Sequence, residues 1–202
     1  MAQAILEREG RLDVLINNAG VFNPKAQVTS EGLDTRFVVN CLAPYLLTRR
    51  LLPLLGASGR VINLSSAAQA PVKLEALSKP LPMADSLAYA QSKLAITTWS
   101  RSLALTLGDG GPAVIAVNPA SFLGTKMVKQ AYGMVGSDVG IGADILLQAA
   151  LSEDFAGASG LYFDNDKRRF APPHPDALDP QKGAQLTEVM EQVLKKVLGE
   201  AA

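Results

Sequence analysis

Two residues of one predicted helix carry side chains that can exchange a proton. Tyr89 and Lys93 stand four positions apart, a spacing that places both on one helix face and lets them meet. A phenol titrates near pH 10 in water, and a cation within about 4–6 Å favours its ionised form. Both extend an apolar stripe at helical spacing, formed by Ile96, Trp99, Leu103 and Leu107. The plainer interpretation is a tyrosine and a lysine whose polar ends reach solvent.

Small and polar residues follow three short apolar segments of the chain. They are Asn17 to Gly20, Ser65 with Ser66, and Asn118 to Ser121. Any one of these groups is explained as a turn, because Asn, Gly, Pro and Ser favour turns. In an open parallel sheet, however, ligands bind outside the carboxyl ends of the strands. Three such ends together predict one crevice, beside the helix end that carries Tyr89.

A polar residue also interrupts the apolar stripe of an earlier helical segment. Asn40 falls within a stripe made of Leu33, Phe37, Pro44, Leu47 and Leu51. Pro44 has no N–H and cannot bond the carbonyl of Asn40 four residues before it. A buried free carbonyl needs a partner, often water, which makes Asn40 a candidate site residue. The alternative is a packing kink with a bound water and no further role.

The elements that must position these residues alternate along the chain. Strands are expected at 11–16, 60–64, 113–117 and 161–163. Helices are expected over about 31–55, 85–107, 139–151 and 189–198. Loops are expected at 71–85, 122–137 and 171–180. Short apolar strands between helices predict an α/β fold, with a parallel sheet covered on both faces.

Length and composition exclude several classes of protein. The chain has 202 residues, 48% apolar and 19% charged, which suits one folded domain. Lys and Arg number 19 and so do Asp and Glu, a zero balance that argues against nucleic acid as a partner. Cys41 and His174 are the sole cysteine and histidine. An intrachain disulfide and a metal site built from several Cys or His residues are therefore excluded.

The sequence also argues against membrane insertion. The first residues, MAQAILEREGR, are charged by positions seven and eight and do not read as a signal peptide. The most apolar stretch, 41–55, is interrupted by Arg49, Arg50 and two prolines, so it cannot cross a bilayer as one apolar run. We therefore expect a cytoplasmic protein in a reducing compartment, with no membrane partner.

Five sequence elements, taken in order, resemble the short-chain dehydrogenase/reductase family. They are NNAG at 17–20, Asn40, NLSS at 63–66, YAQSK at 89–93, which fits Tyr-x-x-x-Lys, and NPAS at 118–121, which is similar to Asn-Pro-Gly. A lone Tyr-x-x-x-Lys is a weak signal, whereas five elements in the right order and context are a strong one. The resemblance covers about residues 3–165. It implies a Rossmann-like, doubly wound sheet and hydride transfer between NAD or NADP and a carbonyl or alcohol substrate.

The resemblance implies a role for each matching residue. Tyr89 would transfer the proton at the substrate oxygen, and Lys93 would favour the phenolate and hold the nicotinamide ribose. Ser66 would hydrogen-bond the substrate carbonyl as charge grows on it, with Ser65 as the alternative. Asn40 would hold, through its main-chain carbonyl, a water that links Lys93 to solvent. The implied cofactor contacts are Asn17, Ala19, Gly20, Tyr89, Lys93, Pro119, Ala120 and Ser121.

The sequence departs from the family pattern at several points. Ala120 stands where the family has glycine and needs a backbone shape that glycine adopts more easily. Thr125 comes about one residue later than an expected nicotinamide-contacting threonine, and 71–85 resembles an insertion of the retinol-dehydrogenase-like branch. The family's glycine-rich turn, Thr-Gly-x-x-x-Gly-x-Gly, matches nowhere. The segment 14–16 would be the family's fourth strand, so we expect an incomplete sheet of strands four to seven.

These observations predict two segments and leave two functional readings open. Residues 1–165 are expected as a partial dinucleotide-binding and catalytic domain, and 166–202 as a Pro-rich loop and helix extension. The alternative to an oxidoreductase is a non-enzymatic fragment that binds a partner through its open sheet edge. That apolar edge, at 14–16, also predicts self-association.

Two further patterns are given plainer interpretations. A serine hydrolase using His174 is disfavoured, because no G-x-S-x-G elbow occurs in the sequence. The charged residues between Asp164 and Arg169 are expected to form a solvated face.

Overall fold

A five-stranded sheet forms the centre of the molecule in the computed structural model, which describes residues 2–199. Its strands lie in the order β1 (Leu12–Asn17), β2 (Leu55–Leu64), β3 (Ala113–Asn118), β4 (Tyr162–Asp164) and β5 (Arg169–Phe170). The first four strands run parallel, and the short β5 returns antiparallel to β4. The parallel α/β sheet predicted from the sequence is confirmed, whereas the two-residue β5 was not predicted.

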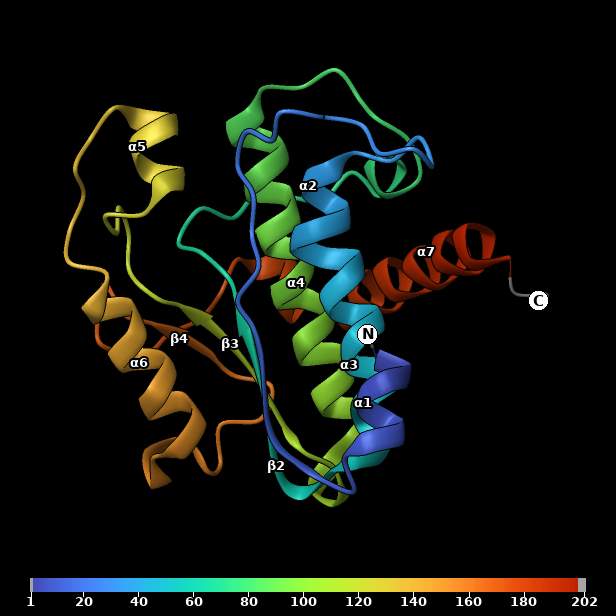
Figure 1. The fold of residues 1–202 in the computed structure, drawn as a ribbon, viewed down its shortest axis with the longest axis vertical. Coiled ribbons are helices and arrows are strands. Elements are labelled where there is room, and N and C mark those ends of the chain that lie inside the picture. Colours follow the sequence, from blue (N-terminus) through green and yellow to red (C-terminus); the bar gives the residue numbers. More distant parts are fainter. Residues whose placement is uncertain (1, 200–202) are drawn as a thin grey trace.

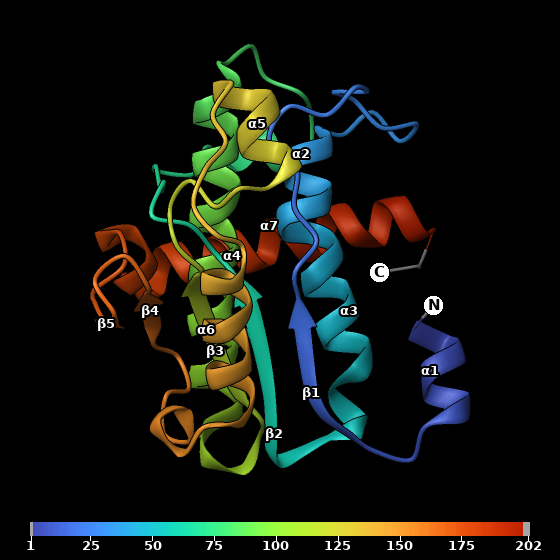
Figure 2. The same cartoon turned by 60° about the vertical axis from the view of Figure 1, so that its left-hand side comes forward.

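Helices cover both faces of this sheet (Figures 1 and 2). The α-helices are α1 (Ala2–Arg8), α2 (Thr35–Phe37), α3 (Ala43–Leu51), α4 (Asp85–Leu107), α5 (Lys126–Tyr132), α6 (Gly140–Leu151) and α7 (Pro180–Leu198). Shorter turns of helix are η1 (Val38–Leu42), η2 (Leu52–Leu54), η3 (Leu74–Leu77), η4 (Gly108–Gly110), η5 (Glu153–Phe155) and η6 (Pro175–Leu178). The helix predicted at 85–107 is confirmed at both ends by α4. Among the helices of residues 2–199, none combines the length and apolarity that a membrane crossing requires.

The helix predicted at 31–55 is wrong as a single element. Asp34 caps α2, its side chain accepting the Arg36 N–H, so the helix begins later than predicted. A π-helical turn, η1, then directly precedes α3, where Pro44 cannot donate a regular helical hydrogen bond. Leu55 already belongs to β2.

Two other predicted boundaries differ for local reasons. The last helix, α7, begins nine residues before the predicted Val189, because Asp179 caps it and Pro180 stands at its first position. Gly183 disfavours a helix at the start of α7 in the sequence. In the fold it lets α7 approach α4 closely, because a Cβ at Gly183 would lie 2.5 Å from Ser102 Oγ. Within the predicted loop 122–137, Thr125 caps the short helix α5.

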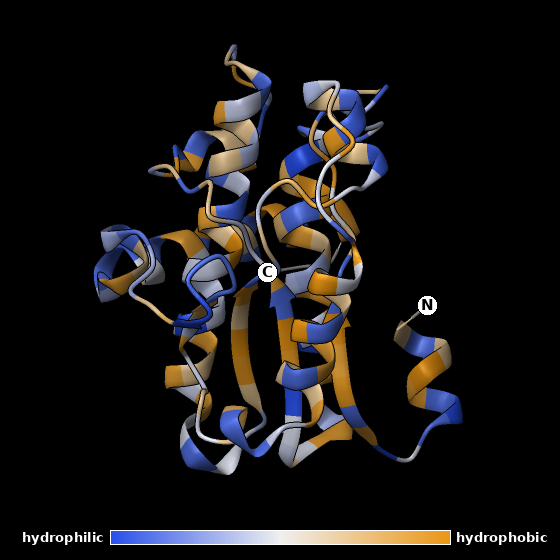
Figure 3. Ribbon diagram, turned by 90° about the vertical axis from the view of Figure 1, so that its left-hand side faces the viewer, coloured by the Kyte–Doolittle hydropathy of each residue, from blue (hydrophilic) through white to orange (hydrophobic). Residues whose placement is uncertain are grey.

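The apolar core lies mainly between the sheet and the layer formed by α3, α4 and α7. The strands are largely apolar along their length (Figure 3), and α6 covers the opposite face, where Ile145 packs against Ile62 and Ile115. Trp99, on α4, is fully buried beside Tyr45, with ring centroids 5.4 Å apart. Within the described residues, its Nε1 has no hydrogen-bond partner.

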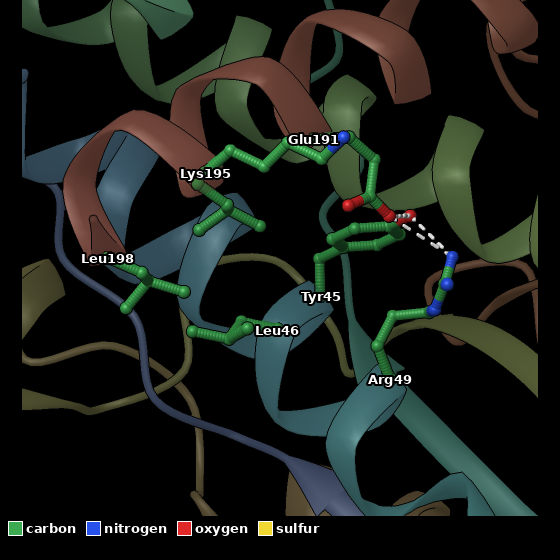
Figure 4. A pocket seen from close by; sticks show the side chains of 7 residues that line it. Tyr45, Leu46, Arg49, Glu191, Lys195 and Leu198 are labelled. Carbon is green, nitrogen blue, oxygen red and sulfur yellow. Dashed lines mark hydrogen bonds and ion pairs between the residues drawn. The ribbon is translucent and has the colours of Figure 1, made fainter. Parts of the chain in front are cut away.

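The C-terminal helix α7 is tied to α3 by a polar cluster beside a small cavity (Figure 4). Tyr45 donates a hydrogen bond to Glu191, and Arg49 Nη1 lies 3.1 Å from both the Tyr45 hydroxyl and a Glu191 carboxylate oxygen. The cavity holds about 100 Å³ and is also lined by apolar side chains of Leu46, Leu194 and Leu198. It lies in the packing interface of two helices, away from the strand ends.

One buried thiol beneath α7, that of Cys41, makes the stability of the fold depend on pH. Cys41 is fully buried, 3.8 Å from the Met190 sulfur, and burial raises the pKa of its thiol above the ordinary value of 9.0. Above pH 9 the unfolded chain loses this proton while the folded chain keeps it. The free energy of unfolding therefore falls as pH rises, by about 1.4 kcal/mol per pH unit from this group.

We expect Cys41→Ala to flatten the alkaline loss of stability, although the variant is less stable near neutrality because of the cavity. Urea unfolding of both proteins between about pH 8 and pH 10.5 gives the slope of the free energy of unfolding against pH. The difference between the two slopes is the contribution of the Cys41 thiol, because the other titrating groups are the same in both proteins. Equal slopes in the two proteins would contradict the prediction.

Candidate active site

The parallel strands point toward the end of the molecule where α5 and the first turns of α4 lie (Figure 2). Lys93 reaches this end of the sheet from α4 and is buried, with 4% of its surface exposed. Its Nζ donates a hydrogen bond of 2.7 Å to the carbonyl of Leu64, the last residue of β2. Burial lowers the pKa of Lys93 to about 8. The structure thus places a buried amine with a lowered pKa at the carboxyl end of β2.

The Tyr89 side chain lies between Lys93 and Ser66. Lys93 Nζ is 5.7 Å from the centroid of the Tyr89 ring, and Ser66 is close enough to affect the titration of the Tyr89 hydroxyl. Burial raises the pKa of Tyr89, the nearby Ser66 hydroxyl lowers it, and nearby Tyr132 raises it, so that the net shift is upward. The sequence predicted a lowering by Lys93. That effect stays a prediction; in the structure the Lys93 amine lies over the ring face and donates to the Leu64 carbonyl.

The two serines after β2 occupy different environments. Ser65 is buried, and its Oγ lies 2.5 Å from Thr97 Oγ1 and 3.4 Å from the Lys93 carbonyl, inside the contact with α4. Ser66 is half-buried, and its Oγ accepts the Ala68 N–H at 3.1 Å while facing Tyr89. The geometry therefore favours Ser66 over Ser65 as the residue that acts with Tyr89.

Asn40 is fully buried and uses its side chain, a role that sequence reasoning missed. Its Oδ1 accepts the Val21 N–H at 2.8 Å, and its Nδ2 donates to the Val21 carbonyl and to Ser92 Oγ, each at 2.9 Å. Ser92 in turn donates to the Tyr89 carbonyl at 2.7 Å. The carboxamide thus links the segment after β1 to the turn of α4 that carries Tyr89. The water expected on the Asn40 main-chain carbonyl stays a prediction.

The residues of the NNAG segment after β1 face in different directions. Gly20 faces the site, because a Cβ there would lie 3.5 Å from Lys93 Nζ and 3.6 Å from Asn40 Oδ1. Ala19 is exposed beside it. The side chain of Asn17 points the other way: its Nδ2 donates to Thr48 Oγ1 at 3.0 Å and to Asn63 Oδ1 at 2.7 Å. Its donors fasten β1 to β2 and α3, and the cofactor contact implied for Asn17 stays a prediction.

The NPAS turn after β3 is held by the hairpin that follows β4. Asp166 accepts the Ser121 N–H at 2.8 Å and the Ser121 hydroxyl at 2.6 Å, and Asn165 Nδ2 donates to the Pro119 carbonyl at 2.9 Å. The Ser121 side chain is thus engaged within the protein, and its implied position beside the nicotinamide stays a prediction. Pro119 and Ala120 are half-buried.

The solvated face predicted for 164–169 is wrong at its first residue. Asp164 is only 4% exposed and accepts hydrogen bonds from Asn118 at 3.0 Å and Lys167 at 2.7 Å. Burial alone raises the pKa of Asp164, but the bonds from Lys167 and Asn118 outweigh it, and the net pKa is lowered. The charged residues here brace the end of β3. The charge pattern did not indicate this role, because Asn118 and Ser121, which bond Asp164 and Asp166, are distant in sequence.

Ala120 adopts the backbone conformation for which the sequence raised doubt. Its φ is +136°, a region that costs a residue with a Cβ about 1–3 kcal/mol.

We expect Ala120→Gly to raise the free energy of unfolding by about 1 kcal/mol, since the relief of backbone strain exceeds the cost of the added entropy of the unfolded chain. Thermal or urea unfolding measures the change. In the control Ala19→Gly, at a residue without positive φ, stability should fall, and a loss at both positions would contradict the prediction.

An aromatic series that the sequence did not predict covers Tyr89. Phe22 lies 5.1 Å from Tyr89 and 5.7 Å from Tyr132, between ring centroids, and Tyr132 lies 5.3 Å from Phe122. Phe122 and Tyr132 are about half exposed. No periodic pattern connects these residues, which come from three separate segments. Together they form an apolar rim beside the phenol.

Comparison of the sequence and of the fold with known proteins identifies one family. The chain belongs to the short-chain dehydrogenases, because the sequence model described as short chain dehydrogenase matches residues 1–136. Mouse retinol dehydrogenase 12 is 34% identical over 180 residues, covering 83% of this chain and 57% of that protein. Human retinol dehydrogenase 13 is 32% identical over 204 residues, covering 92% of this chain and 61% of that protein. The chain thus spans roughly three fifths of the curated relatives it matches.

Solved structures agree with this assignment. An uncharacterised protein from Mycobacterium paratuberculosis aligns with a TM-score of 0.75 at 27% identity, over 96% of this chain and 71% of that chain. The landomycin C-6 ketoreductase LanV, solved with bound NADP and rabelomycin, aligns with a TM-score of 0.57 at 29% identity, over 81% and 64% of the two chains. The Rossmann-like fold class predicted from the sequence is confirmed.

Proposed function

We propose that this chain is an NAD- or NADP-dependent oxidoreductase that interconverts a carbonyl compound and an alcohol. The observation that carries the proposal is the meeting of three side chains: the buried amine of Lys93 lies 5.7 Å from the centroid of the Tyr89 ring, and Ser66 lies near the Tyr89 hydroxyl. Oxidoreductase activity is the activity of the family, and LanV was solved with NADP bound. Residues 1–165 would carry these groups, with 166–202 as an extension packed across α3 and α4. The cytoplasmic location expected from the sequence stays a prediction.

The residues present fit the nicotinamide half of such a cofactor. Among the described residues, Lys93 Nζ has one hydrogen-bond acceptor, the Leu64 carbonyl, although an ammonium carries three donors. Gly20 lies opposite it without a side chain, and Ala120 borders the same end of β3. When bound, the cofactor would supply or accept the hydride. The glycine-rich turn that holds the pyrophosphate in the family is absent from the 202 residues.

The side chains would donate the proton, stabilise the developing charge and bind the substrate during carbonyl reduction. Tyr89 Oη would donate its proton to the substrate oxygen, and Ser66 Oγ would hydrogen-bond the same oxygen as negative charge develops. Lys93 would stabilise the phenolate left on Tyr89 and hold the ribose hydroxyls. Phe22, Tyr132 and Phe122 would surround an apolar substrate. Oxidation of an alcohol uses the same groups in reverse.

The direct test is turnover of the chain with a nicotinamide cofactor. The protein is mixed with NADH or NADPH and a panel of aldehydes and ketones, and with NAD or NADP and a panel of alcohols that includes retinol, the substrate class in its relatives' names. Reduced nicotinamide is followed by absorbance. Consumption of reduced cofactor that depends on a carbonyl compound supports the proposal. No turnover with any pair of cofactor and substrate would overturn it for this chain.

The second candidate, a non-enzymatic fragment, is favoured by the open edge of the sheet. Within the described residues β1 pairs with β2 alone, and Ile16 on β1 is 42% exposed. A free apolar edge of this kind is a template for pairing with another chain. In this reading the protein binds a partner and performs no hydride transfer.

We expect the isolated chain to self-associate and to bind a dinucleotide weakly. The exposed β1 edge drives association, and the absent glycine-rich turn removes the pyrophosphate contacts. Light scattering after size-exclusion chromatography gives the mass, and a titration with NADH and NADPH gives the affinity. The control Ile16→Lys, which adds a charge to the edge, should reduce association. A monomer that binds either dinucleotide at micromolar concentration would contradict both expectations.

A further inference from the structure

The Ser66 carbonyl oxygen accepts hydrogen bonds from two side chains distant from the Tyr-x-x-x-Lys motif. Tyr162 Oη donates to it at 3.1 Å, and Gln69 Nε2 donates at 3.0 Å. Tyr162 lies on β4 and is 5% exposed, whereas Gln69 is half-buried in the segment after β2. Two donors on one carbonyl restrict rotation of the peptide that follows Ser66. The backbone at Ser66, from which its side chain projects, is therefore held both by Gln69 of its own segment and by Tyr162 of β4.

The same network extends to the segment before α7. Gln69 Oε1 accepts the main-chain N–H of His174 at 2.9 Å, so both ends of the Gln69 carboxamide are engaged. The His174 imidazole does not contact Gln69 in these bonds. Its Nδ1 accepts the Asp176 N–H at 3.2 Å and so caps η6. His174 thus acts through its backbone, as a brace for Gln69.

We propose that Tyr162, together with Gln69, is a positioning residue that holds the Ser66 peptide so that Ser66 Oγ faces the Tyr89 hydroxyl. The proposal rests on the proposed function for its chemical meaning, because Ser66 and Tyr89 are the groups that would act on the substrate oxygen. The contacts themselves exist without substrate or cofactor. They therefore can be tested independently of turnover.

The position of the Tyr162 hydroxyl supports a role beyond packing. A phenylalanine would fill the same apolar site, as Phe163 does on the opposite face of β4, and a buried hydroxyl has to find a partner to offset its desolvation. Burial, with Asp164 and Asp166 nearby, raises the pKa of Tyr162. The hydroxyl thus remains protonated at neutral pH and can act as a donor to Ser66.

The test uses the whole chain labelled with ¹³C at the ζ carbon of its tyrosines. There are four, Tyr45, Tyr89, Tyr132 and Tyr162, and each resonance is assigned by its phenylalanine variant. The Tyr89 resonance responds to hydrogen bonding at its oxygen, and Ser66→Ala defines the shift caused by loss of the Ser66 bond. We expect Tyr162→Phe to move the Tyr89 resonance in the same direction. Gln69→Leu should do likewise and serves as a second variant if Tyr162→Phe does not fold.

Tyr45→Phe is the matched control. It also removes one hydroxyl from a buried tyrosine, but that hydroxyl bonds Glu191 and Arg49 on the α7 side of the molecule. Its Tyr89 resonance should stay at the wild-type position even where its thermal stability falls as far as that of Tyr162→Phe. A Tyr89 resonance that is unmoved in both Tyr162→Phe and Gln69→Leu would overturn the proposal. So would an unmoved resonance in Ser66→Ala, because the bond to be positioned would then be absent.

Turnover supplies a second readout. Displacement of Ser66 should lower kcat of Tyr162→Phe by roughly 10- to 100-fold, with little change in the KM for the cofactor. An unchanged kcat in an active protein would overturn the proposal. If the wild type turns over no substrate, the proposed function fails, while the resonance experiment still decides whether Tyr162 positions Ser66.

Discussion

Replacing Tyr89 by phenylalanine is expected to lower kcat by about 100- to 10,000-fold, the contribution of a positioned proton donor. The substitution keeps the ring that packs 5.1 Å from Phe22 and beside Lys93 and removes only the transferable proton. Binding of the cofactor should change little, because Lys93 and Gly20 remain in place. The loss should therefore appear in kcat far more than in the KM for the cofactor.

Steady-state rates of wild type and Tyr89→Phe, with the best cofactor and substrate found for the chain, measure this effect. Tyr45→Phe is the control, because it removes the hydroxyl of another largely buried tyrosine remote from the site. It should keep near wild-type turnover. Full activity in Tyr89→Phe would refute the mechanism, even if the protein proved to be an oxidoreductase.

The largest expected loss of stability follows the removal of a buried cation, Arg36. Its guanidinium is 3% exposed and bonds Asp34 through Nε at 3.0 Å and Nη2 at 2.6 Å. Its Nη1 bonds Asp85, the first residue of α4. Asp34, which caps α2, is itself buried. Arg36→Met would leave that carboxylate without its counter-charge, which typically costs about 3–5 kcal/mol.

Urea unfolding of Arg36→Met against wild type measures this loss. Arg49→Met is the matched control, because Arg49 also pairs with a carboxylate, that of Glu191, but both side chains are more than one third exposed. An exposed pair of this kind contributes about 0–1 kcal/mol. The double variant Arg36→Met with Asp34→Asn should recover part of the loss, since no buried charge remains unpaired. Equal losses in the two single arginine variants would contradict the argument.

Local patterns predicted those parts of the fold that depend on neighbours in sequence. The stripe from Tyr89 to Leu107 predicted most of α4, and the short apolar segments predicted β1 to β4, although β2 begins at Leu55 and not at the expected residue 60. These features depend on helical spacing, strand length and backbone sterics, which a single sequence displays.

The contacts that require distant partners could not be predicted in this way. Asn17 appeared as a turn residue, and only the register of β1 beside β2 shows that its side chain meets Asn63. Asp166 appeared as a surface charge, yet it bonds Ser121, 45 residues away. Arg36 gave no signal at all, because its burial and its bond to Asp85 on another helix arise only in the folded chain. Polar side chains show their partners only once the fold brings them together.

The burial of Trp99 gives the chain an intrinsic optical reporter. It is the sole tryptophan, its ring is fully enclosed, and within the described residues its indole N–H meets no acceptor. An indole in such dry surroundings emits at shorter wavelength than one in water. Its emission should shift toward the red when α4 separates from α3, since Tyr45 on α3 packs against its edge. Fluorescence of the unlabelled protein would then follow separation of these two helices during unfolding.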